Sequence, residues 1–359
     1  MTYAGQPQLL KKYNSDLIEQ LIVEHGTMTK PELAALSNLS LPTVNKLVDE
    51  LVSLGKLTTG ESRTASGAGR PARTYAINGN YGAVITVKYD AGIWLGTSLS
   101  LSGVPHATAQ CPARGNSVEE ISSVISELEK AAENVLEIGI SIPGIVLADG
   151  TITSIPAVAS LDGVNLEKEL TDRFGIRVMT ENDVKLMTLG YYRTEMKHAD
   201  NIAFIYAKER IGAGLIISGQ LFRSSGSFAG EFGYIPVSLD ESGDMHYRNG
   251  GSLETALALA RQKNDVDMIY RILTHMVSTC VSVVNPEAVV IYTEDDALDT
   301  ERIARGVSRY IPSYGIPAIV KPGSCDYEIK GLYEMAMEKQ KSRCWLLDEV
   351  ESRVKEHYE

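Results

Sequence analysis

Residues 29–55 read TKPELAALSNLSLPTVNKLVDELVSLG and contain two helix start signals a short distance apart. The first is a capping box, in which Thr29 caps the helix and Glu32 reaches back to the cap, with Pro31 in the first turn. Ser40 supplies the second cap, and apolar residues then recur at helical spacing: Val44, Leu47, Val48, Leu51 and Leu54. Gly55 is a natural stop, so the stretch predicts two helices joined by a tight turn.

An earlier helix is predicted to end near Gly26, and its apolar positions are Leu17, Ile18, Leu21 and Ile22. Three short helices of which the last two are joined by a tight turn are typical of a helix-turn-helix domain. In such a domain the N-terminal half of the third helix enters the major groove of DNA. We therefore expect base and phosphate contacts from its outward side chains: Thr43, Asn45 and Lys46.

Two acidic residues further along the third helix, Asp49 and Glu50, would repel DNA and are expected to face away from it. After Gly55, residues 56–62 (KLTTGES) and 72–78 (ARTYAIN) predict two short strands, which would complete a winged helix.

The segment RTASGAGRPART, residues 63–74, lies between these strands and is basic and acid-free. We expect Arg63, Arg70 and Arg73 to contact phosphates and the minor groove. The alternative is a solvated loop that happens to be basic.

Charge is distributed unevenly along the 359 residues, whose net charge is −12. The first eighty residues carry +1, so contact with nucleic acid is expected to be confined to them. No apolar run approaches the length of a membrane span, and the N-terminus lacks the apolar core of a signal peptide. The four cysteines are scattered, which favours a reducing cytoplasm and argues against a cysteine metal site. We therefore expect a cytoplasmic protein with no membrane contact.

Strand and helix patterns alternate after Gly82 and predict two related α/β halves with a cleft between them. The predicted domains are a winged helix at residues 1–80, a first α/β lobe at 81–190 and a second lobe with a C-terminal helix at 191–359. One winged helix buries too little surface for typical operator affinity. We therefore expect a homodimer, or a dimer of dimers, on a palindromic operator.

Several motifs follow one another in this α/β region: IPGIV (142–146), DGVNLEKEL (162–170), TEND (180–183), IGAG (211–214), AGEFGY (229–234), GGSLET (250–255) and VNPEAVVI (284–291). In this order and spacing they resemble the ROK family, which groups repressors with sugar kinases. The winged helix, with GRPA (69–72) before the first strand of the α/β region, is similar to the family's repressor branch. The resemblance implies an actin-like, hexokinase-like two-lobed fold with a sugar site in the cleft.

The resemblance also implies a set of sugar-binding residues: Asn165, Asn182, Asp183, Glu231 and Glu254. Carboxylates accept hydroxyl hydrogen bonds and amides both donate and accept, so these residue types suit a polyol. The alternative for Asp183, Glu231 and Asn165 is a helix cap. Lys185, where the family usually has asparagine, is interpreted as a helix-surface lysine, although it would also suit an anionic ligand.

The segments that hold ATP in the family's kinases are altered here. Asp90 and Gly92 remain in the first phosphate loop, but the spacing of its other glycines and threonine is lost. The second loop has long side chains where glycines and a threonine would let phosphate approach the backbone: Lys208, Glu209 and Arg210. Tyr292, Thr293 and Glu294 replace the nucleoside-binding glycines. We therefore expect no ATP or other cofactor, no catalytic residues and no enzymatic activity.

The family's zinc ligands, one histidine and three cysteines, are also replaced, by Tyr234, Met245, Tyr247 and Ser252. None of these is a strong zinc ligand, and His246 nearby is a single histidine in a polar loop, so no metal is expected.

Three functions remain open. The favoured hypothesis is a sugar-responsive transcriptional regulator, most simply a repressor of carbohydrate genes, with operator DNA and a sugar or sugar derivative as its partners. The alternatives are a carbohydrate kinase with an accessory DNA-binding domain, and a regulator that responds to a partner protein.

Overall fold

The computed structural model describes residues 6–63, 71–132, 134–208, 210–236, 251–293 and 298–341. The N-terminal domain has three helices and a three-stranded sheet of order β1-β3-β2. Its elements are α1 (Gln6–His25), β1 (Met28–Thr29), α2 (Lys30–Ser37), α3 (Leu41–Ser53), β2 (Leu57–Arg63) and β3 (Ala72–Ile77). The three helices and the β2–β3 hairpin confirm the predicted winged-helix elements, and β1 is an additional strand.

Both predicted caps are present in this domain. The Thr29 N–H donates to the Glu32 carboxylate at 2.8 Å, and the Glu32 N–H donates back to the Thr29 hydroxyl. The Ser40 hydroxyl accepts from the Thr43 N–H at the start of α3. These contacts fix the turn between α2 and α3, and the buried faces of the helices pack around Ile18, Leu33 and Val48.

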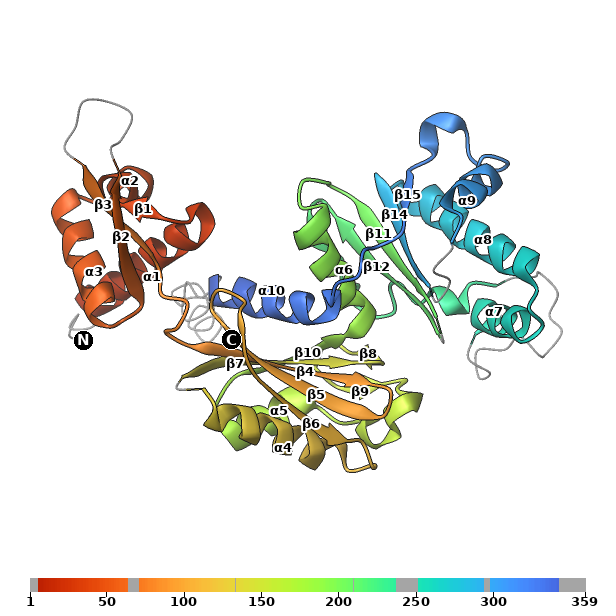
Figure 1. Ribbon diagram of the computed structural model, residues 1–359, viewed down its shortest axis with the longest axis horizontal. Helices are drawn as coiled ribbons and strands as arrows, with labels where there is room; N and C mark the ends of the chain where they lie inside the picture. The colour runs from red at the N-terminus through yellow and green to blue at the C-terminus, as the bar shows by residue number, and fades with distance from the viewer. Residues whose placement is uncertain are drawn as a thin grey trace, which may run out of the picture.

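The first lobe has a five-stranded sheet of order β10-β7-β4-β5-β6. Its strands are β4 (Ala83–Asp90), β5 (Ile93–Ser100), β6 (Pro105–Pro112), β7 (Val135–Ile142) and β10 (Val178–Asn182). Helices α4 (Ser117–Lys130) and α5 (Leu166–Phe174) cover one face of this sheet (Figure 1). The short strands β8 (Ile145–Val146) and β9 (Ile152–Thr153) pair beside it.

The second lobe repeats the same strand plan in the order β13-β12-β11-β14-β15. Its strands are β11 (Ile202–Ala207), β12 (Ile211–Ile217), β13 (Gln220–Leu221), β14 (Ala288–Thr293) and β15 (Ala318–Val320). In each lobe three antiparallel strands are followed by two parallel ones, which confirms the prediction of two related halves. The helices of this lobe are α7 (Ser252–Gln262), α8 (Val266–Val284) and α9 (Thr300–Val307).

Two helices, α6 (Asp183–Glu195) and α10 (Tyr327–Lys341), lie between the two sheets (Figure 1). They cross closely because glycines lie at the contact. A Cβ on Gly190 would lie 1.9 Å from the Tyr327 carbonyl oxygen, and one on Gly331 would lie 2.0 Å from the Leu186 carbonyl oxygen. The predicted domain division assigned α10 to the second lobe. In the structure Leu332 of α10 packs against β4 and β7 of the first lobe as well as α6, because its apolar residues face that sheet.

Candidate functional site

A cavity of about 340 Å³ lies between the lobes, at the N-terminal end of α6. Residues of both lobes line it: Gly144, Ile145, Ser154, Pro156, Asn182, Asp183, Val184, Lys185, Tyr206, Arg210, Ile211, Gly212, Ala213, Ala229, Glu231, Tyr234 and Glu254. Four of the five predicted sugar-binding residues are therefore brought together here, from segments that are far apart in the sequence.

The chain enters α6 from β10, which places two of these side chains at the helix start. The Asn182 side chain caps α6 by accepting from the Lys185 N–H, and its amide donates to the Gly144 carbonyl of the first lobe. Asp183 accepts from the Val184 N–H at 2.8 Å through one carboxylate oxygen. The cap considered for Asp183 is thus made by Asn182, and Asp183 lines the cavity from the first helical position.

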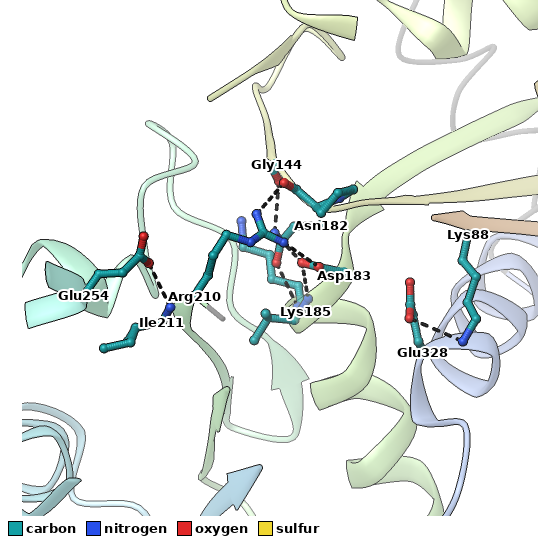
Figure 2. A network of polar contacts seen from close by, with 11 residues as sticks. Lys88, Gly144, Asn182, Asp183, Lys185, Arg210, Ile211, Glu254 and Glu328 are labelled. Carbon is teal, nitrogen blue, oxygen red and sulfur yellow. Dashed lines mark hydrogen bonds and ion pairs between the residues drawn. The ribbon is translucent and has the colours of Figure 1, made fainter. Parts of the chain in front are cut away.

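Arg210, directly before β12 in the second lobe, reaches across the cleft (Figure 2). One guanidinium nitrogen donates to the Pro143 carbonyl at 2.6 Å, and the other donates to the Asp183 carboxylate at 3.3 Å. Burial raises the pKa of Asp183, and the Arg210 charge opposes that rise. The sequence analysis treats Arg210 only as a replacement in a phosphate loop. Its pairing with Asp183, 27 residues away and across the cleft, carries no local sequence signal.

The interpretation of Lys185 as a helix-surface lysine is wrong, because the residue is 5% exposed and lines the cavity. The helix α6 is covered by a sheet on each side, so its lysine has no solvated face to occupy. The spacing could have indicated this position, since Asn182 and Lys185 lie three residues apart and share one helical face.

Two glutamates line the second-lobe side of the cavity. Burial raises the pKa of Glu231 to about 7, although Lys185 lowers it. Glu254, in the first turn of α7, accepts from the Ile211 N–H at 2.9 Å, and burial raises its pKa as well. Within the described residues the Glu231 carboxylate accepts no hydrogen bond, which leaves it available to a hydroxyl.

Asn165 lies outside the cavity lining, and both its amide oxygen and its amide nitrogen form hydrogen bonds elsewhere. It caps α5 by accepting from the Lys168 N–H at 3.0 Å, and its amide donates to the Asp149 carbonyl at 2.7 Å. The helix-cap alternative therefore describes Asn165 in this structure.

The segments associated with ATP in the family's kinases are occupied by internal contacts. On β4, Lys88 pairs with Asp326 at 2.7 Å and with Glu328 of α10 at 3.7 Å (Figure 2). Burial, and to a smaller extent the charge of Asp183, raises the pKa of Glu328 to about 8. The Lys208 ammonium lies 4.2 Å from the centre of the Tyr292 ring.

Three further residues belong to these altered segments. Thr293 is on β14 and receives a hydrogen bond from Arg261, whereas Glu209 and Glu294 lie outside the described residues.

The positions of the family's zinc ligands are only partly described. Tyr234 lines the cavity and its ring packs 5.2 Å from that of Phe228, and Ser252 is buried in the first turn of α7. Met245, His246 and Tyr247 lie outside the described residues. Among the residues with described positions, no group of three or more His, Cys, Asp and Glu side chains is arranged to hold a metal ion.

The predicted DNA-contacting residues of α3 lie near its start. Lys46 is exposed, Asn45 is partly exposed, and the Thr43 hydroxyl lies 2.8 Å from that of the capping Ser40.

The acidic pair on the same helix is neutralised by other helices. Asp49 pairs with Lys30 of α2 at 2.5 Å, and Glu50 pairs with Lys11 of α1 at 2.6 Å. These ion pairs reduce the repulsion that the two acids would exert on a phosphate backbone.

The hairpin β2–β3 carries two of the three predicted arginines. Arg63 ends β2 and pairs with Glu32 of α2 at 2.6 Å, while Arg73 on β3 is exposed. Arg70 lies outside the described residues. Arg73 is thus available to a phosphate as it stands, whereas Arg63 must exchange its contact with Glu32.

Within the ranges that the structure describes, no helix has the length and apolar character needed to cross a membrane.

Comparison with known proteins identifies the central part of the chain. Residues 108–258 match the model described as the ROK family, which confirms the resemblance drawn from the motifs. A putative xylose repressor of Caldicellulosiruptor sp. (strain Rt8B.4) is 27% identical over 66% of this chain. The DNA-binding transcriptional dual regulator NagC of Escherichia coli (strain K12) is 26% identical over 72% of this chain. The matches span 62% and 67% of the lengths of these two relatives.

Solved structures share the fold over most of the chain. A ROK family transcriptional regulator, described as a homolog of the E. coli MLC protein, covers 94% of this chain and 98% of its own, with a TM-score of 0.75 at 19% identity. A putative N-acetylmannosamine kinase from Listeria monocytogenes covers 72% of this chain and 99% of its own, with a TM-score of 0.59 at 16% identity. The predicted actin-like two-lobed fold with an N-terminal winged helix is therefore confirmed.

Proposed function

We propose that this chain, whose central part is a ROK family domain, is a DNA-binding transcriptional repressor of carbohydrate genes. Its effector is a sugar or sugar derivative bound in the cavity between the lobes, and the two-lobed domain transfers no phosphoryl group. The proposal is carried by the presence, in one chain, of a winged helix and a cavity lined by Asn182, Asp183, Glu231 and Glu254.

The lining suits a polyhydroxylated ligand better than a nucleotide. Carboxylate and amide oxygens accept from sugar hydroxyls, and the Asn182 amide and Arg210 also donate. A triphosphate, in contrast, needs open backbone N–H groups and cations that are not already paired. Lys88 is held by two carboxylates and Arg210 by Asp183 and Pro143, which leaves Lys185 as the one lining cation without a close partner among the described residues, too little charge for a triphosphate.

The comparisons support a regulator rather than a kinase. Relatives that match about two thirds of the chain are named as repressors or transcriptional regulators. The regulator fold covers 94% of this chain, whereas the kinase fold covers 72%. The kinase hypothesis retains one supporting observation, since Asp183 stands where the family's kinases have their catalytic base.

Coupling between the cavity and the winged helix follows from the position of Arg210. Because Arg210 of the second lobe lies against Pro143 and Asp183, a ligand bound among these groups contacts both sides of the cleft and sets a new angle between the lobes. In a homodimer bound to a palindromic operator, such a change alters the spacing of the two winged helices. We place this assembly in the cytoplasm, where operator DNA is accessible.

The experiment combines selection of a binding site with a ligand screen. The full chain selects an operator from a random DNA library, and a panel of sugars is tested for shifts in thermal unfolding and in operator affinity. A coupled ATPase assay over the same panel tests the kinase alternative. The proposal predicts a palindromic site, at least one sugar that changes operator affinity, and no sugar-dependent ATP hydrolysis. ATP turnover would contradict it, and operator binding that no sugar changes would favour control by a partner protein.

A further inference from the structure

Lys185 is a buried cation whose hydrogen-bonding capacity is largely unused. Lys185 is 5% exposed, and its ammonium has three N–H donors. Within the described part of the chain, its one hydrogen bond is to the Ser227 carbonyl at a long 3.4 Å. A buried ammonium without a close partner is energetically unfavourable, so its presence here indicates a missing partner.

The nearby carboxylates do not supply that partner. Asp183 is already engaged by Arg210 and by the Val184 N–H. Glu231 feels the charge of Lys185, but no ion pair joins the two side chains among the described contacts, and the pKa of Glu231 stays near 7. A lysine devoted to Glu231 would hold that carboxyl ionised well below neutrality.

Lys185 also lines a second cavity, of about 400 Å³, and it is the residue that the two linings share. Arg223 lies on this second lining and pairs with the buried Glu181 at 2.7 Å. The Thr180 hydroxyl on the same lining is buried and has no hydrogen-bond partner in the described structure. Lys185 is therefore the donor that links this second space to the cavity lined by Asp183 and Glu231.

We propose that the effector is a sugar derivative with a negatively charged substituent, a carboxylate or a phosphate, and that Lys185 binds this charge. The sugar hydroxyls would lie against Asp183 and Glu231, and the charged group would extend toward the second cavity. This inference rests on the proposed function and specifies the class of its ligand.

The test measures binding by calorimetry for matched trios of a neutral sugar, its uronic acid and its 6-phosphate, beginning with glucose, glucuronate and glucose 6-phosphate. Inorganic phosphate alone is the control for the charge without the sugar. In the unaltered chain we expect one charged form to bind at least tenfold more tightly than its neutral parent, and the carboxylate and phosphate arms identify which. Inorganic phosphate is expected to bind far more weakly because it lacks the hydroxyl contacts.

Lys185→Met should reduce the ratio of charged to neutral affinity to about one, a loss of about ten- to a hundredfold for the charged form. Lys185→Arg should retain the preference. Methionine fills a similar volume without a charge, and thermal unfolding of each variant verifies that it folds. Lys168→Met is the matched control, because Lys168 is 78% exposed on α5 and its loss should leave the ratio unchanged.

The outcomes separate this inference from the proposed function. A neutral sugar that binds as tightly as its charged forms and changes operator affinity would overturn the charge selection while leaving the proposed function in place. Retention of the charge preference in Lys185→Met would overturn the assignment to Lys185. Binding by no sugar of either class would overturn the proposed function, and the charge selection with it.

Discussion

Replacing Arg210 by methionine tests the contact across the cleft. The change removes a hydrogen bond of 2.6 Å to the Pro143 carbonyl and one of 3.3 Å to the Asp183 carboxylate. Hydrogen bonds that involve a charged group contribute about 1.5–3 kcal/mol each when well formed. The Arg210 side chain is 35% exposed and its contact with Asp183 is long, so screening lowers the sum. We expect a loss of about 2 kcal/mol in the free energy of unfolding at neutral pH.

The loss should depend on pH in a defined direction. Burial already raises the pKa of Asp183 above 3.8, and removing the Arg210 charge raises it further. An acid whose pKa is higher in the folded state than in the unfolded state destabilises the fold once it ionises. The deficit of Arg210→Met is therefore smallest near about pH 4 and grows as the pH rises toward and above neutrality.

Thermal unfolding of both chains between about pH 5 and pH 8 measures this effect. A loss of about 2 kcal/mol corresponds to a decrease in melting temperature of roughly 4–8 °C. Arg305→Met is the matched control, because Arg305 is 65% exposed and its ion pairs within the described residues are with surface acids, Asp299 and Glu301. Equal deficits at both ends of the pH range, or a deficit no larger than that of the control, would refute the assigned role of Arg210.

Three further results are expected. The pKa of Glu231 is raised from 4.5 to about 7, so ionisation should lower stability by up to about 3 kcal/mol between pH 4.5 and 8, and Glu231→Gln should lack most of this decline in unfolding experiments. In titrations of operator DNA, Arg73→Ala should weaken binding to all sequences and reduce by about 1 the slope of log affinity against log salt concentration. Asn45→Ala should lower the binding free energy by about 1–3 kcal/mol at particular base pairs. Equal effects of Asn45→Ala on all sequences would contradict its role. Gly190→Ala places a Cβ 1.9 Å from the Tyr327 carbonyl oxygen and should destabilise the chain by about 3 kcal/mol, whereas Gly226→Ala meets no atom within 4 Å and should unfold at nearly the unaltered temperature.

Local sequence signals predicted local structure well. The capping box of Thr29 and Glu32 and the cap at Ser40 are determined by residues three positions apart, so their geometry follows from the sequence. The two-residue strand β1 carries no such signal, because its pairing with β3 depends on residues more than forty positions away.

The cavity was predictable only in part. The family resemblance predicted Asn182, Asp183, Glu231 and Glu254, all of which line the cavity. It also predicted Asn165, which instead serves as a helix cap, a role that asparagine fills equally well. The burial of Lys185 depends on α6 being covered on both sides, and sequence periodicity alone does not reveal a second covering layer. The contacts of Arg210 and of Lys88 arise from the packing of the two lobes and α10, which only the folded structure shows.

We propose that ligand in the cavity controls DNA binding by the winged helix. Fluorescence anisotropy measures this control as operator affinity with and without the sugar found by the ligand screen, for the unaltered chain and for Asp183→Ala. Thermodynamic linkage requires that sugar and operator change each other's affinity by one common factor, about 5–150-fold for typical allosteric systems. We predict that the unaltered chain shows this factor and that Asp183→Ala binds the operator nearly as before but no longer responds to the sugar. An undiminished sugar response in Asp183→Ala would contradict the account.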